Sequence, residues 1–388
     1  MGTNTMKIET KLVHAGEPEP RIEGAVSLPI FQSATYESRE GAGYHDIHYL
    51  RLSNTPNHST LHKKLASLEN AEDALVTASG MAAITTTLLS ILSAGDHMLV
   101  QECLYGGTHT FITKDLRGFG ISHDFIDVED PGSWKTKLRP STKAIYVESM
   151  TNPLLQVADL EAVAAFARES QITSCIDNTF PSPVNFRPAE HGFDLSLHSG
   201  TKYLNGHTDI VAGAIIGRAN LVRAVKLRLD HLGGTLDTHA CFLLHRGLKT
   251  LALRVRHQNE SALYLARKIE SHPAVTTVNY PGLETHVHHQ RARKLFDGFG
   301  GMMSFELKGG LSAARRFVKA VRLPISAPSL GGVETLVTLP ATTSHAGLSP
   351  EEREGLGISD GLVRVSVGIE ATDDLADDFE QALNSLEG

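Results

Sequence analysis

The sequence predicts an α/β protein in which a large domain with a mainly parallel sheet precedes a smaller α+β domain. Short apolar runs alternate with amphipathic segments through the middle of the chain, which is typical of βαβ units with helices on both faces of the sheet. This alternation gives way after about residue 245 to long helical segments and alternating strands. The length of 388 residues also favours two or three domains over one.

The first half of the chain supplies the elements of the large domain. Residues 1–55 begin with a stretch rich in Gly, Pro and Tyr that has little periodicity, so we predict an extended N-terminal arm. Apolar residues recur at helical spacing in 60–72 and again in 158–169, which predicts two helices. The candidate strands are the apolar runs at 74–77, 97–101, 144–148, 173–176, 195–198 and 211–216.

The C-terminal part has a different pattern. A long helix is predicted at 257–271, and a closing helix is predicted at 372–386. Between them, the segment GLVRVSVGIE at 361–370 alternates like a half-buried strand. We therefore place a large domain at 56–245 and a smaller α+β domain at 246–388.

Composition excludes several classes of function. The 36 basic and 44 acidic residues give a formal net charge of −8, which argues against a nucleic-acid partner. Three cysteines without a C-x-x-C exclude a disulfide framework or zinc ribbon and suit a reducing cytoplasm. The first twenty residues are polar, and Thr and Ser interrupt the most apolar stretch, at 81–95. We therefore expect a cytoplasmic protein without a membrane segment.

The most informative motif is SLHSGTKYLNGH at 196–207, where an apolar strand ends in Ser199, Thr201 and Lys202. Open α/β sheets bind ligands at this edge. Hydroxyls and free backbone N–H groups suit a phosphate, and a nearby lysine can form a Schiff base with an aldehyde. A solvated loop with an ordinary surface lysine gives the same pattern, and the motif taken alone favours that interpretation.

Three further positions fit the same ligand. Asp177 directly follows an apolar strand, where a carboxylate could keep a pyridine nitrogen protonated, although a turn or cap aspartate has the same pattern. Gly80 and Met81 open an apolar helix whose first N–H groups could meet a phosphate. Tyr105 could stack on a planar ring, although a lone tyrosine is more often core or surface.

The ordered motifs SGM, LYGGT, ESMTNP, DNT, HSGTKY, SLGGVET and LVRVSVGIE resemble the Cys/Met-metabolism family of pyridoxal-phosphate enzymes. This family includes cystathionine γ-synthase, cystathionine γ-lyase, cystathionine β-lyase and methionine γ-lyase. The resemblance runs from about Thr10 to the C-terminus. It implies fold type I, as in aspartate aminotransferase, with pyridoxal 5'-phosphate as cofactor and an amino acid as its small-molecule substrate. It also implies a homotetramer built from two tight dimers.

The resemblance implies roles for individual residues. Lys202 looks like the lysine that forms the Schiff base, Asp177 like the partner of the ring nitrogen, and Tyr105 like the tyrosine that stacks on the ring and assists proton transfer. The family's remaining cofactor contacts correspond to Gly80, Met81, Thr179, Ser199 and Thr201 of this chain. The resemblance also implies that Tyr49 and Arg51 reach the phosphate of a neighbouring subunit. The family's substrate contacts correspond to Asn152, Ser329 and Arg364 of this chain, and the resemblance implies that Asn152 and Arg364 hold the α-carboxylate.

The chain departs from the family pattern at three places. Residues 52–57, LSNTPN, are one residue longer before the proline than the usual continuation of Tyr-x-Arg. Pro328 stands where many γ-lyases have glutamate, and a similar Ala-Pro-Ser occurs in plant-type γ-synthases. Gly107 stands where methionine γ-lyases usually carry cysteine, so methionine γ-lyase is the least expected of the four activities.

The resemblance favours a carbon–sulfur lyase that eliminates at the γ or β carbon of cystathionine-like substrates. A γ-synthase, which joins an O-acyl-homoserine to a thiol, uses the same early steps and stays open, as does an aminotransferase on the same fold. A non-catalytic cofactor-binding scaffold is a further alternative, but both Lys202 and Asp177 are present.

Three other motifs are rejected. The segment GISDG at 357–361 fits G-x-S-x-G, but a polar stretch precedes Ser359 where a hydrolase needs a strand. His286, His288 and His289 lack accompanying carboxylates or thiolates, so we expect a solvated loop and no metal site. GFGGMM at 298–303 lacks the glycine spacing of a dinucleotide fingerprint.

Overall fold

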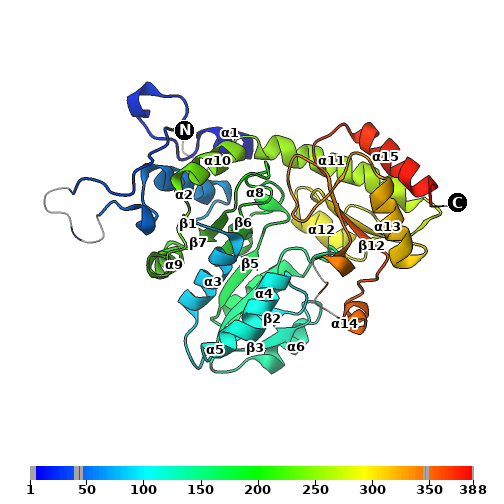
Figure 1. The fold of residues 1–388 in the computed structure, drawn as a ribbon. Helices are drawn as coiled ribbons and strands as arrows, with labels where there is room; N and C mark the ends of the chain where they lie inside the picture. The colour runs from blue at the N-terminus through cyan, green and yellow to red at the C-terminus, as the bar shows by residue number, and fades with distance from the viewer. Residues whose placement is uncertain (1–5, 39–42, 44–46, 344–345, 347–348, 387–388) are drawn as a thin grey trace.

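The computed structural model describes residues 6–38, 43, 47–343, 346 and 349–386. These residues contain a sheet of seven strands and a sheet of five. In Figure 1 the first sheet lies in the cyan and green part of the chain, and helices flank the second sheet in the yellow and red part. The predicted α/β class, with a large sheet domain and a smaller α+β domain, is confirmed. The predicted boundary between 245 and 246 falls inside helix α10 (Thr238–Leu248).

The seven-stranded sheet has the order β1-β7-β6-β5-β4-β2-β3. Strands β6, β5, β4, β2 and β3 run parallel, and β7 is antiparallel to both of its neighbours. Its strands are β1 (Asp73–Thr77), β2 (His97–Gln101), β3 (Ser122–Ile126), β4 (Thr142–Glu148), β5 (Thr173–Asp177), β6 (Leu195–Ser199) and β7 (Gly213–Gly217). The sequence missed only edge strand β3, because SHDFI is largely polar and only its last residue is buried.

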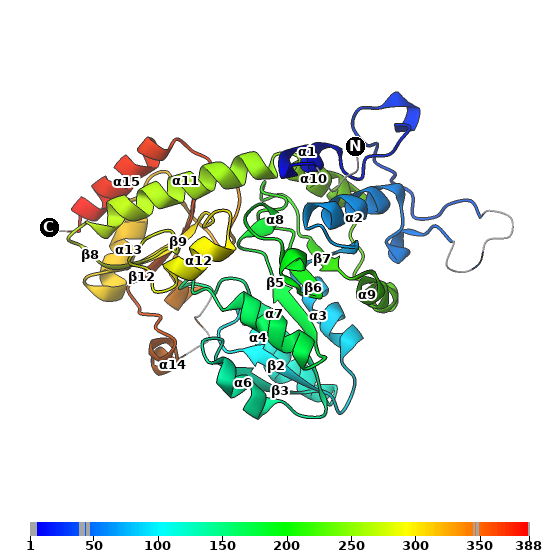
Figure 2. The same ribbon diagram turned by 180° about the vertical axis from the view of Figure 1, so that it is seen from behind.

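Alternate residues of the strands pack on opposite faces of this sheet. Leu75 belongs to a core with residues of α3 (Gly80–Ile91) and α9 (Ala219–Leu232). Its neighbour Val76 belongs to a core with residues of α2 (Pro56–Leu68) and α7 (Leu160–Glu169). Figures 1 and 2, seen from opposite sides, show α3 in front in one view and α7 in front in the other. The sheet is therefore covered on both faces, as predicted.

The five-stranded sheet has the order β10-β11-β12-β9-β8 and its own core. Its strands are β8 (Val275–Asn279), β9 (Met302–Leu307), β10 (Ile325–Ser326), β11 (Leu336–Thr338) and β12 (Leu362–Ser366). Helices α11 (Leu251–Glu270), α13 (Gly310–Ala320) and α15 (Thr372–Asn384) pack with it. The remaining α-helices are α1 (Ile8–His14), α4 (Gly106–Thr110), α5 (Leu116–Gly118), α6 (Pro131–Lys137), α8 (Ser182–Asn185), α12 (His289–Leu295) and α14 (Pro350–Gly355).

Two predicted helices begin earlier than expected. Helix α2 begins at Pro56, because the Thr55 side chain caps it by accepting a hydrogen bond from the His58 N–H. Helix α11 begins at Leu251 rather than near residue 257, since Leu251 and Val255 continue its buried face. In both cases the prediction followed the apolar repeat and overlooked the signals in front of it.

The prediction of a half-buried strand near residue 364 is wrong. Strand β12 is buried along its whole length. Val363 and Val365 pack into the core of the second domain, whereas Arg364 contacts Asn152 of the large domain. Both faces of the strand are therefore covered. Its alternation of apolar and polar residues separates the face towards the core of the second domain from the face towards the large domain, and neither face is open to solvent.

The N-terminal segment is not extended throughout. Residues Ile8–His14 form α1, whose Leu12 is buried in the core that contains α2. Glu17 then lies 2.8 Å from His245 Nε2 and 3.5 Å from Lys64 Nζ, so this part is tied to the body of the chain. Short helices of mixed composition give weak periodicity, which explains the miss. Parts of the predicted arm, at 1–5, 39–42 and 44–46, lie outside the described residues.

The rejected motifs have clear structural positions. Ser359 lies between α14 and β12, so a helix precedes it and a strand comes after it, the reverse of a hydrolase elbow. The expectation of a solvated loop at the histidine cluster is wrong, because His286 and His289 are buried and His289 begins α12. His288 Nδ1 accepts a hydrogen bond from the Val157 N–H, so this segment packs against the large domain.

The described residues offer neither a metal cluster nor a membrane span. They contain no group of three or more His, Cys, Asp or Glu side chains that could hold a metal ion. No helix within the described ranges is long and apolar enough to cross a membrane.

Candidate active site

Three adjacent parallel strands end in polar side chains at the same edge of the large sheet. Strand β4 ends in Glu148, β5 in Asp177 and β6 in Ser199. Glu148 pairs with Asp177 in the strand register, and Asp177 pairs with Leu197 of β6. Because the carboxyl ends of parallel strands meet at one edge, this is where an open α/β sheet binds its ligand.

Asp177 is partly buried at this edge and held by its own loop. Its Oδ1 atom accepts a hydrogen bond of 2.9 Å from the Thr179 N–H. Burial raises the pKa of the Asp177 carboxyl, and the hydrogen bonds from Thr179 and the nearby His198 oppose that rise. This carboxylate is the only acidic group of the predicted site.

Glu148 is a second acid beside Asp177 that the sequence analysis did not name. Its Oε1 atom accepts a hydrogen bond of 2.7 Å from the backbone N–H of Tyr105. Burial, and then the charge of Asp177, raise the pKa of Glu148 well above its ordinary value. A glutamate that ends the apolar run IYVE was the signal that could have found it.

A cradle for an anion lies where α3 begins. Gly80 is the first residue of α3, and the Ser79 side chain caps the helix by accepting from the Ala82 N–H at 3.0 Å. A Cβ atom at Gly80 would lie 2.9 Å from Cβ of Ser199, so only glycine permits this approach. Thr179 Oγ1 accepts the Ser199 N–H at 2.8 Å and fixes that loop. Helix N–H groups beside a serine hydroxyl suit a phosphate.

Thr201 differs from the other predicted phosphate contacts. Its hydroxyl accepts the Ala212 N–H at 3.0 Å and donates to the Ala212 carbonyl at 3.3 Å. These bonds join the loop after β6 to the segment before β7. A phosphate contact from Thr201 remains a prediction.

Lys202 lies at the junction of the two domains. Its Nζ donates a hydrogen bond of 2.7 Å to Oγ of Ser329, which lies between β10 and β11. Burial, with a smaller effect of the positive charge on Arg364, lowers the pKa of the Lys202 amine to about 8. A good fraction of this amine is therefore neutral and nucleophilic near neutral pH.

Arg364 joins the same cluster from β12. Its guanidinium donates at 3.1 Å to Asn152 Oδ1 and at 3.1 Å to the carbonyl of Ser329. The side chain is buried, and burial lowers its pKa to about 10, so it stays charged. Ser329 has φ 98°, a backbone region that a residue with a side chain rarely adopts. Such strain is found at sites where surrounding contacts hold a residue in place.

Tyr105 lies above the Gly80 end of the site. It precedes α4 and is half exposed. A Cβ atom at Gly107 would lie 2.7 Å from Cε1 of Tyr105 and 3.0 Å from Sδ of Met81. The space that a larger residue at 107 would need is therefore occupied by Tyr105 and Met81.

Tyr49 and Arg51 lie elsewhere in this chain, against α9. Arg51 comes after Tyr49 in a single 3₁₀ turn, Leu50–Leu52, so the segment is not extended as the sequence suggested. The two side chains still meet, with the guanidinium carbon 5.5 Å from the centre of the tyrosine ring. The Arg51 side chain also donates to the carbonyl of Asp230. The longer loop is accommodated by Ser53, which has φ 49°.

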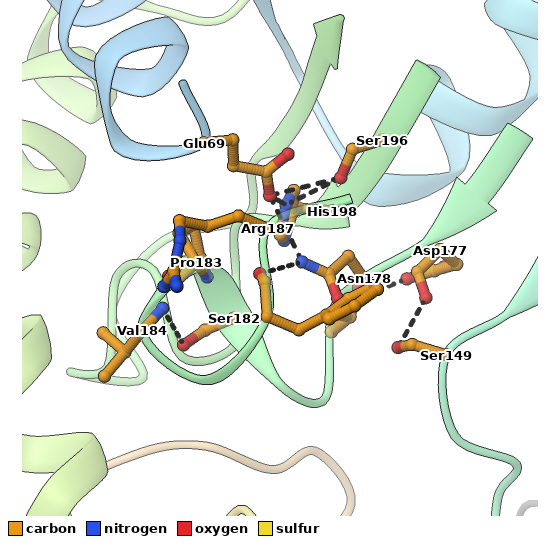
Figure 3. Close-up of polar contacts among 12 residues, drawn as sticks. Glu69, Ser149, Asp177, Asn178, Ser182, Pro183, Val184, Arg187, Ser196 and His198 are labelled. Atoms are coloured by element: carbon orange, nitrogen blue, oxygen red, sulfur yellow. Dashed lines mark hydrogen bonds and ion pairs between the residues drawn. The ribbon is translucent and has the colours of Figure 1, made fainter. Parts of the chain in front are cut away.

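A buried polar network lies behind the end of β5, as Figure 3 shows. Glu69 Oε1 lies 2.6 Å from His198 Nε2 and accepts hydrogen bonds from Ser196 and Asn178, both at 3.2 Å. Asn178 directly follows Asp177, and its amide also donates to the Phe186 carbonyl at 2.9 Å. The sequence analysis assigned no role to these residues, although a histidine inside the apolar run LSLHS was visible.

The fold and this site together define a class of protein. A desolvated lysine, an aspartate on the neighbouring strand and a helix N-terminal cradle are the parts that a pyridoxal-phosphate enzyme requires. The chain belongs to the family described as Cys/Met metabolism PLP-dependent enzymes, whose model matches residues 9–384. The family prediction and the cofactor prediction, pyridoxal 5'-phosphate, are therefore confirmed.

Relatives of known function span the whole chain. It is 40% identical to cystathionine beta-lyase MetC of Bacillus subtilis, over 100% of this chain and 98% of that protein. It is 39% identical to cystathionine gamma-lyase of the same organism, over 98% and 100%, and 40% identical to L-methionine gamma-lyase of Pseudomonas putida, over 97% of each. These identities do not separate the three activities.

A solved structure confirms the fold. Cystathionine gamma-lyase of Lactobacillus plantarum, determined in complex with L-serine, has a TM-score of 0.93 and 36% identity, with 98% of this chain and 100% of that chain covered. The predicted architecture of a large sheet domain and a smaller domain, as in pyridoxal-phosphate enzymes of fold type I, is therefore confirmed.

Proposed function

We propose that this chain is a pyridoxal-phosphate-dependent carbon–sulfur lyase that acts on cystathionine-like amino acids. The observation that carries the proposal is the position of Lys202. Its amine donates to Ser329 of the Asn152–Ser329–Arg364 cluster, which has the chemistry of a carboxylate-binding site. Lys202 itself follows β6, the strand that neighbours the one ended by Asp177. Full-length similarity to cystathionine lyases supports the choice of a sulfur amino acid.

The residues present fit the cofactor. The N–H groups of Gly80 and Met81, with the hydroxyls of Ser199, Thr179 and Thr201, would hold its phosphate. Tyr105 would cover one face of the ring. Asp177 would accept a hydrogen bond from the ring nitrogen and keep it protonated. When bound, the protonated ring supplies an electron sink that stabilises negative charge at the substrate α-carbon.

The protein groups then bind the substrate and move its protons. Arg364 would bind the α-carboxylate through two parallel N–H bonds, with the Asn152 side chain fixing the guanidinium plane. This orientation would bring the α-carbon next to Lys202. The neutral Lys202 amine would take the α-proton, and Ser329 would hold that amine in place. Tyr105 is the second proton carrier because of its position beside the cradle.

A lyase and a synthase differ in the step after the elimination. Water completes a lyase reaction, whereas a thiol that adds to the same carbon skeleton completes a γ-replacement. The lyase is favoured because the curated relatives described above carry that activity. The γ-synthase alternative uses an O-acyl-homoserine and a thiol on the same residues.

The test is the product formed from cystathionine. Elimination at the γ carbon gives 2-oxobutyrate, and elimination at the β carbon gives pyruvate. We expect the loaded enzyme to release one of these keto acids catalytically. Its Lys202→Ala form should release neither. Addition of free cysteine should not divert the products. A protein that releases no keto acid but forms cystathionine from an O-acyl-homoserine and cysteine is a synthase, and the lyase proposal then fails.

We also propose that the active site is completed between subunits of a homotetramer. Tyr49 and Arg51 form a phenol–guanidinium pair that, within its own chain, lies against α9. Such a pair suits one phosphate, and family resemblance supports a phosphate of the neighbouring subunit. We place the enzyme in the cytoplasm, since its three cysteines are unpaired. A non-catalytic scaffold is disfavoured because a lysine with a lowered pKa serves chemistry better than packing.

A further inference from the structure

The Glu69–His198 pair is buried on the opposite side of β6 from the cofactor cradle. His198 and Ser196 project from the sheet towards the core that contains α2, whereas Leu195 and Leu197 project towards the core that contains α3. Glu69 ends α2 and reaches the sheet from that side. Exposed fractions of 0% for Glu69 and 1% for His198 leave no solvent to stabilise either charge alone.

The contacts of the pair require a charge balance. A fully buried carboxylate is tolerated in a protein when a cation and hydrogen bonds compensate it. The separation of 2.6 Å between Glu69 Oε1 and His198 Nε2 is that of a charge-assisted hydrogen bond. Within the described residues Glu69 Oε2 and His198 Nδ1 have no hydrogen-bond partner, so the contact between Oε1 and Nε2 and the hydrogen bonds that Oε1 accepts are what offset the burial of the pair.

Two connections lead from this pair to Asp177. The first runs through the chain and a hydrogen bond. Asn178 is the residue after Asp177 and donates to Glu69, so the end of β5 is held by the pair. The second is electrostatic, because His198 is on the strand that neighbours β5 and favours the ionised form of Asp177.

We propose that His198 and Glu69 are positioning residues for Asp177, which they hold in place and keep ionised for the ring nitrogen of the cofactor. Other groups that face Asp177 act against this. Glu148 and Tyr146 come from β4, and the charge of Asp177 contributes to the raised pKa of both groups. His198 favours the ionised form of Asp177 and so lowers the pKa that burial raises. Without a cation behind it, Asp177 would accept a proton at a higher pH.

The decisive variant is Glu69→Gln combined with His198→Gln. This double substitution removes both charges, leaves amide groups that can hydrogen-bond to each other, and avoids the single unpaired charge that His198→Gln alone would leave. His97→Gln is the matched control, since His97 is equally buried in the same sheet but contacts Thr142 and Asp124 at the start of β2.

The experiment measures retention of pyridoxal phosphate rather than turnover, so it does not depend on the proposed lyase activity. Each protein is loaded, equilibrated between pH 5 and 8, and assayed for bound cofactor by absorbance after gel filtration. We expect the double variant to release cofactor at a pH about half to one unit higher than wild type, because Asp177 is protonated sooner. At pH 6 its dissociation constant should be about three- to tenfold weaker.

A double-mutant cycle with Asp177→Asn separates this role from simple packing. If the pair acts through Asp177, the Glu69→Gln/His198→Gln change should have no further effect on cofactor affinity once residue 177 is asparagine. The same loss of affinity in both backgrounds would overturn the proposal, as would a double variant whose release profile matches that of His97→Gln. Thermal unfolding of every variant shows whether that variant was folded under the conditions in which its cofactor affinity was measured.

Discussion

The two halves of the proposed active site are built in different ways. The ring half, with Asp177, Ser199 and Gly80, lies at one edge of one sheet, where strand register alone brings the groups together. The carboxylate half joins Asn152 after β4 to Arg364 on β12, so it exists only when the two domains are docked. Lys202 is bonded across this junction to Ser329. Cofactor binding should therefore depend on one domain, and substrate binding on both.

The largest effect should come from the loss of the group that joins the two halves. Lys202→Ala removes the amine that takes the α-proton, so keto acid release should fall by at least ~10³-fold. The ring half is intact, so cofactor should still bind without a covalent link. Lys143→Ala, at an exposed position on β4, is the control and should leave the rate unchanged. Full activity of Lys202→Ala would contradict the role of Lys202 as the group that joins the ring half to the carboxylate half.

A change confined to the carboxylate half should separate KM from cofactor affinity. Arg364→Lys keeps the charge but loses the planar pair of donors, so KM for cystathionine should rise about 10- to 100-fold. The dissociation constant of the cofactor should stay within about twofold of wild type, because the ring half is untouched. Steady-state kinetics and a cofactor titration on one preparation check both values. An equal rise in KM and in the dissociation constant of the cofactor would show that the two halves do not act separately.

Subunit mixing tests whether the ring half is completed by a neighbour. Arg51→Ala and Lys202→Ala proteins should each be nearly inactive. Co-refolding them in equal amounts should restore about a quarter of wild-type activity, because half the dimers are mixed and one of their two sites has both residues intact. Mixtures assayed at matched concentration that stay as inactive as the parents would place Arg51 within its own chain, or outside the site.

The smallest effect concerns the pH at which the lysine reacts. Only the neutral amine attacks an aldehyde, so the rate at which apoprotein captures pyridoxal phosphate should rise with pH, with its midpoint at a pH of about 8. The positive charge of Arg364 contributes to that lowered pKa, so Arg364→Gln should move the midpoint to higher pH. Stopped-flow absorbance measures the rate. A midpoint near 10.5, the value of an ordinary lysine, would contradict the desolvation of Lys202.

The ring half could be predicted from the sequence because its residues follow apolar strands. Asp177 and Lys202 were predicted in this way, and in the structure Asp177 ends β5 while Lys202 follows β6. Their roles stay predictions. Glu148 and His198 ended apolar runs in the same manner, but no motif distinguished their roles. Their significance depends on which neighbour is buried beside them, which is a property of the packed sheet.

The carboxylate half and the edges of the fold could not be predicted from local patterns. The contact of Arg364 with Asn152 spans 212 residues of sequence, and here family resemblance rather than periodicity indicated the pair. Strand β3 was missed because an edge strand with polar residues lacks an apolar run. The helix Ile8–His14 was missed because its seven residues give too short a repeat, and its burial depends on α2.

The most direct test of the account is to locate the cofactor on the chain. The loaded protein is reduced with borohydride, which fixes a lysine-bound cofactor as a stable amine, then digested and mapped by mass spectrometry. The account predicts that the modified peptide contains Lys202 and that Lys202→Ala gives no modified peptide. Modification of a different lysine, or a fully active protein that carries no lysine-linked cofactor, would contradict it.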